Sequence, residues 1–338
     1  MINIILYLLL FVFSIFLTYF VQQFTLKKAI LDIPSERSLH SIPIPRGGGV
    51  TIVVSFLIGL LLMYYTGILH KNYVMPLLVG GFFVAAIGFI DDIFTLTAKY
   101  RFYVQMTFAI FAVVAIGGYS SIDLGAVKIH VGLLGSIFAV LLIIWLTNLY
   151  NFMDGSDGIA AIQTIFVSFT VALFLIMKQA HGFAFMQLLL GVSTLGFLVW
   201  NWPPAKIFLG DVGSGFLGYI FALSAIITAK LNIIPLFTWL ILLGYFIFDA
   251  TFTLVYRLIQ RKKVYQAHRE HLYQRLISNG YTHKQVLGVV CLVNLFVLLP
   301  SAYISVIYPK LSGLIWLLLT IIALISWSIL VKGRYKMT

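Results

Sequence analysis

The sequence predicts an all-α polytopic integral membrane protein, and three observations support this prediction. Of the 338 residues, 62% are hydrophobic and only 9% are charged, which excludes a soluble globular protein. Eleven apolar runs are each long enough to cross a hydrocarbon core of about 30 Å. Basic residues gather in alternate connections between these runs. We therefore expect about eleven transmembrane helices in a single membrane-embedded domain, residues 1–338.

The apolar runs follow one another with short connections between them. The first has no basic residue before it, whereas Lys27 and Lys28 follow it. This pattern favours a membrane span with its N-terminus outside over a cleaved signal peptide. The runs lie at roughly 3–21, 50–69, 73–90, 102–118, 131–147, 159–177, 183–200, 212–229, 233–255, 286–308 and 311–331.

The distribution of basic residues gives the orientation. Eleven spans that start outside leave the C-terminus and five connections on the cytoplasmic side, which then holds 17 of the 22 lysines and arginines, in agreement with the positive-inside rule. A net charge of +12 fits loops that face anionic lipid and an anionic substrate, and we expect no nucleic-acid partner. The cytoplasmic segments are 22–49, 91–101, 148–158, 201–211, 256–285 and 332–338.

The acidic residues gather on the same side. Of the ten aspartates and glutamates, only Asp123 falls outside, and Asp249 lies near the cytoplasmic end of its span. The adjacent pair Asp91 and Asp92 closes the third span. Neighbouring carboxylates repel each other and are costly beside lipid, so either a solvated helix end or a divalent cation is expected there. Magnesium suits the pair, because it combines one or two carboxylates with phosphate oxygens and water.

The polar stretch 147–158 follows a long apolar run. Asn148, Asn151 and Asp154 recur every three residues, so they share one face if the preceding helix continues. Gly155 and Gly158 then allow the backbone to turn close to a bound ligand. Asp157 is expected at the start of the next helix. The stretch predicts one wall of a polar binding site.

Two further cytoplasmic loops contain candidate binding residues. In the Pro- and Gly-rich loop 31–49, Arg37, His40 and Arg46 favour an anion-binding lip, and the alternative is a loop that only re-enters the membrane. Its three glycines after Arg46 allow close approach to another helix or to a phosphate.

The second loop is 201–214, where a helix is expected to begin near Asp211. Asp211 is either a plain N-cap or a metal ligand beside backbone N–H groups that face a phosphate. Phe208 is either lipid-facing or a flat surface for an aromatic base.

Segment 256–285 is basic and helical in pattern. His268 and His271 would share a helix face, with Arg275 one turn further on. Hydrogen bonding of this face to an anionic phosphate is favoured over a metal pair or a solvated membrane-surface helix. Asn279–Gly280 should stop the helix, and Thr282 with Gln285 forms a capping box for the next one.

The remaining features carry no predicted chemistry. The single cysteine, Cys291, lies in an apolar run, so disulfides and Cys-based metal sites are excluded. Residues 120–130 alternate around Gly125 and predict a small hairpin on the outer side.

Five blocks in one order give the chain a family resemblance. It resembles the polyprenyl-phosphate N-acetylhexosamine-1-phosphate transferases, glycosyltransferase family 4. Three consecutive histidines and a Pro-Thr-Met-Gly-Gly loop, typical of the pentapeptide branch, are absent, so the chain looks more like the O-antigen- or capsule-initiating branch. The blocks are Asp32–Pro34 with Arg37–His40 and Pro45–Gly48, Asp91–Leu96 with Arg101, Asn148–Gly158, Phe208–Ser214 and His268–His271.

The resemblance implies an activity. Such enzymes transfer a sugar 1-phosphate from a UDP-N-acetyl-hexosamine, or a UDP-deoxy-aminosugar, to undecaprenyl phosphate and release UMP. The cofactor is Mg²⁺, with Mn²⁺ as a substitute. The product starts O-antigen or other cell-envelope polysaccharide synthesis. The implied location is the bacterial cytoplasmic membrane, with a periplasmic N-terminus and an active site facing the cytoplasm, and analogy suggests a homodimer.

The resemblance also implies residue roles. Asp211 resembles the metal ligand, and Asp91 and Asp92 resemble the acidic pair at the reaction centre. His268 and His271 align with the catalytic histidine motif. The residues expected to bind substrate, by resemblance or by charge, are Arg37, His40, Arg46, Lys99, Arg101, Asn148, Asn151, Asp154, Asp157, Phe208 and Arg275.

A second functional class, an ion-coupled membrane transporter, also uses carboxylates in a many-span protein. Transporter sites lie near the membrane midplane on interrupted helices, often in repeated halves. In this chain the carboxylates lie at span ends on one side, and no internal repeat is visible. The sequence therefore favours chemistry at the membrane surface. We expect Asp91 and Asp92 to position metal and lipid phosphate for one in-line displacement, with a covalent phospho-carboxylate route as the rival.

Overall fold

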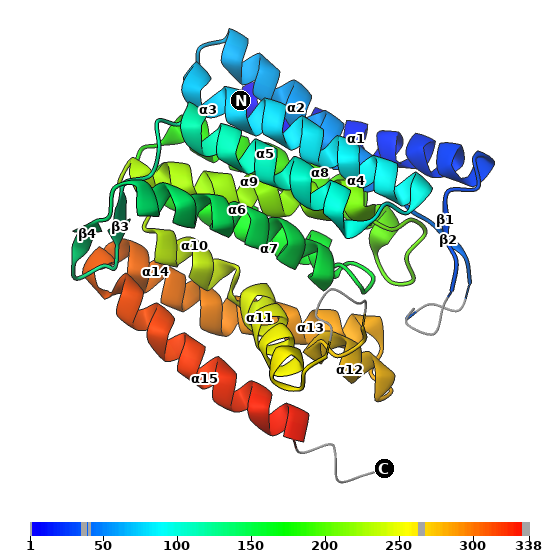
Figure 1. Ribbon diagram of the computed structural model, residues 1–338. Helices are drawn as coiled ribbons and strands as arrows, with labels where there is room; N and C mark the ends of the chain where they lie inside the picture. The colour runs from blue at the N-terminus through cyan, green and yellow to red at the C-terminus, as the bar shows by residue number, and fades with distance from the viewer. Residues whose placement is uncertain (1, 35–38, 40–41, 263–267, 333–338) are drawn as a thin grey trace.

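The computed structural model describes residues 2–34, 39, 42–262 and 268–332, and it shows long helices packed side by side. Arg37 and His40 lie outside the described residues. Within that part the only strands form two short antiparallel pairs, β1 (Leu31–Asp32) with β2 (Ile44–Pro45) and β3 (Ser121–Asp123) with β4 (Lys128–His130). The all-α membrane architecture predicted from composition is confirmed (Figure 1).

The elements follow the apolar runs closely, and each of the eleven runs falls on helical structure. Two of the long helical rods contain π-helical turns, η1 (Pro76–Gly80) and η2 (Asn294–Leu298), and a 3₁₀ turn, η3 (Pro309–Leu311), precedes α15 (Ser312–Lys332). In chain order the elements are α1 (Ile2–Lys27), β1 (Leu31–Asp32), β2 (Ile44–Pro45), α2 (Gly49–Tyr65), α3 (Lys71–Met75), η1 (Pro76–Gly80), α4 (Gly81–Phe94), α5 (Ala98–Ala115), β3 (Ser121–Asp123), β4 (Lys128–His130), α6 (Leu133–Met153), α7 (Ile159–Met177), α8 (His181–Asn201), α9 (Gly210–Lys230), α10 (Leu236–Leu242), α11 (Gly244–Ile259), α12 (Leu272–Ser278), α13 (His283–Val293), η2 (Asn294–Leu298), α14 (Leu299–Ile307), η3 (Pro309–Leu311) and α15 (Ser312–Lys332).

The number of spans can be compared with the eleven expected. Within the described residues, eight helices are long and apolar enough to cross a membrane, and α10 with α11 adds a ninth if this pair, bent by 79°, counts as one span. The two remaining apolar runs correspond to α2, with 17 residues, and α5, with 18 residues.

The bend between α10 and α11 is supported by buried amides. Gln163 of α7 donates from Nε2 to the carbonyl oxygen of Leu242 at 2.9 Å, next to the break. Asn294 donates to Gln163 Oε1, also at 2.9 Å. A carbonyl group that lacks its helical partner inside an apolar bundle would cost free energy, so these amides stabilise the broken span.

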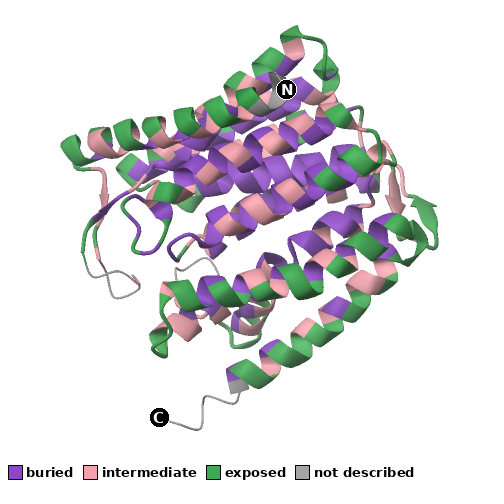
Figure 2. Cartoon of the chain, turned by 180° about the vertical axis from the view of Figure 1, so that it is seen from behind, coloured by how far each residue is buried: buried purple, intermediate pink, exposed green. Residues whose placement is uncertain are grey.

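Helix α9 forms the centre of the bundle. All its residues from Val212 to Thr228 are buried, and it packs against α2, α4 and α6. Figure 2 shows that buried residues concentrate in the middle of the bundle. Glycines make this packing close: a Cβ on Gly218 would lie 2.3 Å from the carbonyl oxygen of Leu146. The central position of α9 fixes Asp211, in its first turn, relative to the surrounding helices.

The expected grouping of the connections at two ends of the bundle agrees with the structure. The β3–β4 pair lies at the end opposite β1 and β2 (Figure 1), and its register, Ser121 with His130, confirms the hairpin predicted at 120–130. The stop at Asn279–Gly280 and the capping box at Thr282 are also confirmed.

The prediction of one helix through segment 256–285 is wrong. Helix α11 ends at Ile259, and Arg261 has a φ of 57°, in the left-handed region that ends helices. Among the described residues, the next helix starts at Leu272. The carboxylate of Asp249 accepts hydrogen bonds from the backbone N–H groups of Leu272 (2.8 Å) and Tyr273 (3.4 Å) and so fixes a new helix start.

Candidate active site

Asp92 joins the end of α4 to the start of α9. Its Oδ1 accepts a hydrogen bond from the backbone N–H of Asp211 at 3.0 Å, and its Oδ2 accepts one from Val212 at 3.2 Å. The N-terminus of a helix carries partial positive charge, which stabilises a carboxylate there. Asp92, and not Asp211, therefore caps α9, which removes the plain N-cap interpretation of Asp211.

Arg46 supports the same junction from the loop before α2. Its Nε donates to the carbonyl oxygen of Asp92 at 2.8 Å, and Nη2 donates to that oxygen at 2.5 Å. The guanidinium also lies 3.8 Å from Asp92 Oδ1. Arg46 thus pairs with the C-terminal carbonyl groups of α4, where a cation is favoured by the helix dipole. A direct contact to substrate phosphate remains a prediction.

Asp91 and Asp211 meet across one cationic nitrogen. Arg101 Nη1, from α5, lies 2.7 Å from Asp91 Oδ2 and 2.5 Å from Asp211 Oδ2. Asn151 donates from Nδ2 to the other oxygen of Asp211 at 2.8 Å. The same amide donates to Ser214 Oγ at 3.0 Å. Residues from α4, α5, α6 and α9 therefore converge on a single site.

This arrangement fits a divalent cation that shares its ligands with a substrate. The two carboxylate oxygens already face a common positive group, Arg101 Nη1. Among the residues that the structure describes, no group of three or more histidine, cysteine, aspartate or glutamate side chains could hold a metal alone. Mg²⁺ needs only one or two carboxylates when phosphate oxygens and water complete its shell. Asp211, with Asp91 beside it, is the metal-binding candidate.

Asp154 lies at the C-terminal end of α6, near this cluster. Burial raises the pKa of Asp154 well above its usual range, and the negative charges of Asp211, Asp92 and Asp157 raise it further. A cation in the cluster would reduce this repulsion and favour the ionised form. The electrostatics around Asp154 therefore also favour a cation-binding site.

Asp157 and the nearby glycines hold the turn after Asp154. Asp157 Oδ2 accepts a hydrogen bond from the backbone N–H of Ala205 at 3.0 Å, which ties the turn to the connection between α8 and α9. Helix α7 starts just after Gly158, whose φ of 74° suits glycine. A Cβ on Gly155 would lie 2.2 Å from the hydroxyl of Tyr273, so this glycine is needed for packing against α12.

The glycines after Arg46 make the close approach predicted for them, and they make it to a helix. Gly48 donates its N–H to the carbonyl oxygen of Phe208 at 2.9 Å, and Gly49 donates to Leu209 at 2.8 Å. A Cβ on Gly49 would lie 2.3 Å from the Cα of Gly213. The start of α2 is thereby docked on the start of α9, beside Asp211.

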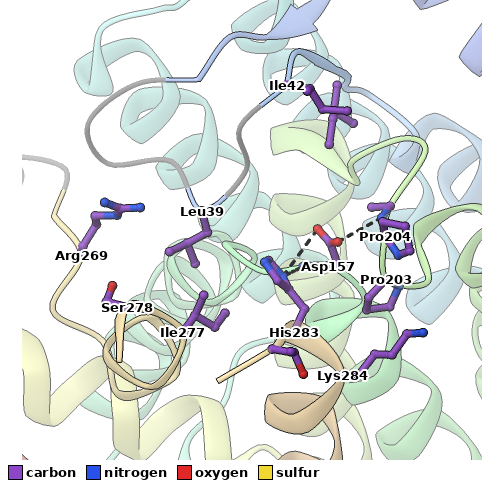
Figure 3. A pocket seen from close by; sticks show the side chains of 13 residues that line it. Leu39, Ile42, Asp157, Pro203, Pro204, Arg269, Ile277, Ser278, His283 and Lys284 are labelled. Atoms are coloured by element: carbon purple, nitrogen blue, oxygen red, sulfur yellow. Dashed lines mark hydrogen bonds and ion pairs between the residues drawn. The ribbon is translucent and has the colours of Figure 1, made fainter. Parts of the chain in front are cut away.

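A cavity of about 890 Å³ opens next to Asp157, between several connections of the chain. Ile44, Pro203 and Pro204 form an apolar part of its wall. Arg269, Lys284 and the side chains of Asp157 and His283 supply polar groups (Figure 3). Its volume is in the range of small-molecule sites.

The two motif histidines do not lie on one helix face, so that prediction is wrong. His271 precedes the first residue of α12, is only 2% exposed, and has its ring centroid 4.8 Å from that of His268. Burial lowers the pKa of His271 to about 4, and the charges of Arg257 and Arg275 add to the shift. His271 is therefore neutral near pH 7. The catalytic role expected of both histidines remains a prediction.

The structure also gives the partners or the exposure of four other expected binding residues. Arg275 donates from Nε to the carbonyl oxygen of Glu270 at 2.7 Å. Asn148 does not join Asn151, because its amide donates to Gln105 of α5 at 2.7 Å. Lys99 is exposed at the start of α5. Phe208 is half-buried, with its backbone N–H donating to Pro45 at 2.8 Å.

Sequence reasoning missed His283, the first residue of α13. Its Nδ1 lies 2.9 Å from Ser156 Oγ and 3.2 Å from the backbone nitrogen of Asp157. His283 and Asp157 are 126 positions apart. No rule of sequence spacing links residues so far apart. The capping box of Thr282 and Gln285 accounts for the start of α13 without any role for His283.

Comparisons with known proteins agree with this geometry. The model of the family described as glycosyl transferase family 4 matches residues 74–229. A probable undecaprenyl-phosphate N-acetylglucosaminyl 1-phosphate transferase of Bacillus subtilis is 31% identical, over 90% of this chain and 84% of the relative. An undecaprenyl-phosphate alpha-N-acetylglucosaminyl 1-phosphate transferase of Thermotoga maritima is 28% identical, over 88% of this chain and 91% of the relative. A decaprenyl-phosphate N-acetylglucosaminephosphotransferase of Mycobacterium tuberculosis is 26% identical, over 82% of this chain and 77% of the relative.

The low pKa of His271 leads to a prediction about stability. Because the pKa is about 4 in the folded chain and about 6.5 in an unfolded one, the unfolded chain binds the extra proton between these values. The contribution of His271 to the free energy of unfolding is therefore full above pH 6.5. It decreases by about 1.4 kcal/mol per pH unit as the pH falls from 6.5 towards 4. His271→Asn should flatten this part of the profile. Thermal unfolding in detergent from pH 7.5 to 4.5 measures it, and parallel profiles for the two proteins would contradict the assignment.

Proposed function

Because the chain belongs to glycosyl transferase family 4, we propose that it transfers N-acetylglucosamine 1-phosphate from UDP-N-acetylglucosamine to undecaprenyl phosphate and releases UMP. The relatives are described as acting on undecaprenyl or decaprenyl phosphate and on N-acetylglucosamine. The product would start envelope polysaccharide synthesis. The Arg37–His40 and Pro45–Gly48 blocks support the O-antigen- or capsule-initiating branch, for which a UDP-deoxy-aminosugar is the alternative donor.

The observation that carries this proposal is the meeting of Asp91, Arg101 and Asp211 at one end of a membrane bundle. The reaction joins two polyanions, and their mutual repulsion is its first obstacle. Asp211 and Asp91 would hold Mg²⁺, or Mn²⁺ in its place, and the bound ion would supply positive charge that offsets this repulsion and the charge of the leaving UMP. Arg101 lies at the same place and supplies positive charge from the protein itself.

The geometry supports a single in-line displacement. The acceptor phosphate has its second pKa near about 6, so it is mostly ionised at neutral pH and needs little help from a base. One of its oxygens attacks the β-phosphorus of the donor, and the bond from that phosphorus to the bridging oxygen breaks as UMP leaves. Asp91 Oδ1 accepts from the backbone N–H of Leu96 at 2.5 Å, and both oxygens of Asp92 are paired as described. These hydrogen bonds support a positioning role for both carboxylates.

The orientation follows from charge. The chain is a multi-pass membrane protein, and 17 of its 22 lysines and arginines lie in the segments that also supply the site or in the C-terminal segment. By the positive-inside rule, this end faces the cytoplasm of a bacterial inner membrane, where UDP-sugars are made. The N-terminus is then periplasmic and the C-terminus cytoplasmic.

The transporter alternative loses its strongest candidate residue. Asp249 is buried within the bent span, where a transported ion could bind. Its carboxylate is engaged by the backbone of α12 and by Thr253 Oγ1 at 3.2 Å. Asp249 therefore has a structural role in placing the segment after α11.

The activity itself can be tested by UMP release. The purified protein with UDP-N-acetylglucosamine, undecaprenyl phosphate and Mg²⁺ should release UMP, and omission of the lipid or of Mg²⁺ should stop release. Asp211→Asn should lower the rate by about 100-fold or more, because it removes a charge at the metal position. Asp123→Asn, at the other end of the bundle, is the matched control. Absence of UMP release with a panel of UDP-sugars, together with solute uptake by proteoliposomes, would favour the transporter.

The one-step mechanism makes a separate prediction. Incubation with a donor labelled at the β-phosphate, in the absence of lipid, should leave no label on the protein, because no carboxylate acts as a nucleophile. Acid quenching and mass spectrometry of the peptide that contains Asp91 and Asp92 would measure this. Stoichiometric label on either aspartate would refute the one-step mechanism and leave the overall transfer intact.

A further inference from the structure

His283 connects α13 to the turn that precedes α7. Its Nδ1 is 3.2 Å from the backbone nitrogen of Asp157 and 2.9 Å from Ser156 Oγ. The backbone N–H can only donate, so Nδ1 must be the unprotonated acceptor of the ring. Asp157 Oδ1 lies 3.7 Å from Nδ1, beyond hydrogen-bonding distance. These contacts assign the neutral tautomer of His283, in which Nε2 carries the proton.

The N–H of Nε2 is therefore a donor at the cavity wall. His283 lines the cavity, and its side chain is 21% exposed. Among the described residues no partner accepts from Nε2. A neutral N–H group of fixed direction suits a carbonyl oxygen, whereas Lys284 and Arg269, which also line the cavity, suit phosphate.

The apolar part of the cavity wall restricts what can enter. Ile44, Pro203 and Pro204 present apolar surface with no side-chain donor or acceptor. A sugar ring would turn several hydroxyl groups towards this surface and lose their hydration. A flat heterocycle has apolar faces and keeps its polar atoms at its edge, so it can pack against the prolines and still reach His283.

On the basis of the proposed function, we propose that His283 binds the UDP-sugar and that its Nε2–H donates a hydrogen bond to a carbonyl oxygen of the uracil ring. Its Nδ1 performs a second task, because it holds the 156–157 turn in place from α13. Asp157 is in turn tied to Ala205, and the turn follows Asp154 beside the metal-binding candidate. One imidazole thus links nucleotide recognition to the placement of the acidic cluster.

Two substitutions separate the roles of the two ring nitrogens. His283→Asn keeps an acceptor near the position of Nδ1 and removes the donor at Nε2. His283→Gln places an amide near the position of Nε2 and can restore a donor. Binding of UMP, the proposed product, to the purified protein with Mg²⁺ should weaken about tenfold in His283→Asn and recover to within about threefold in His283→Gln. The KM for the UDP-sugar should rise by a similar factor, with little change in kcat.

The chain offers a matched control in His70. Its Nδ1 also accepts from a backbone N–H, that of Asn72 at 3.3 Å, and it lies at the other end of the bundle. His70→Asn should bind UMP as the unaltered protein does. Unchanged UMP affinity in His283→Asn would overturn the proposal, as would an effect on sugar selectivity alone, since the cavity would then hold the sugar.

Thio-substituted UMP tests the carbonyl contact directly. Sulfur is a weaker acceptor than oxygen, so either 2-thio-UMP or 4-thio-UMP should bind the unaltered protein less tightly than UMP. That loss should disappear in His283→Asn, where the N–H is already missing. Additive losses for both analogues would overturn the contact. Because UMP binding is measured without turnover, failure of the transfer assay alone would count against the proposed function and not against His283.

Discussion

The site depends on one buried interaction, the hydrogen bonds from the N-terminus of α9 to the carboxylate of Asp92. Asp92 is only 3% exposed, and such a charge is costly unless it is fully paired. Its partners are the N–H groups of Asp211 and Val212. The metal-binding candidate is therefore part of the helix turn that Asp92 caps, so the position of one aspartate determines that of the other.

Close backbone contacts make this interaction possible. A Cβ on Gly88 of α4 would lie 2.4 Å from the carbonyl oxygen of Asp211, and one on Gly49 would lie 2.3 Å from Gly213. Helices α2, α4 and α9 thus meet where side chains are absent. The acidic residues and Arg101 then converge from separate helices, and rigid helices hold such a constellation more accurately than loops do. The cavity next to Asp157 is lined by α13, through His283.

The sequence was sufficient for features that depend on local pattern. Apolar runs predicted the helices, glycines and prolines predicted the turns, and the acidic blocks predicted which connections meet. It was not sufficient where a distant partner decides the outcome. The spacing of His268 and His271 predicts a shared face only if one helix continues, and Asp249 starts a new helix at Leu272. Asn148 has the same spacing as Asn151, yet Gln105 of α5 binds its amide. The sequence did not indicate a role for His283, because its partners Ser156 and Asp157 come from another part of the chain.

UMP release by Gly88→Ala, compared with Gly288→Ala, tests most directly whether the close contact of α4 with α9 sets the active site. Both glycines lie inside helices, but a Cβ on Gly288 meets nothing within 4 Å, whereas one on Gly88 meets the backbone of Asp211. Forcing these helices apart costs about 1–3 kcal/mol, which a folded protein can tolerate. Gly88→Ala should remain folded and inserted but lose UMP release by about tenfold or more, while Gly288→Ala keeps the rate. Full activity in Gly88→Ala would contradict this account.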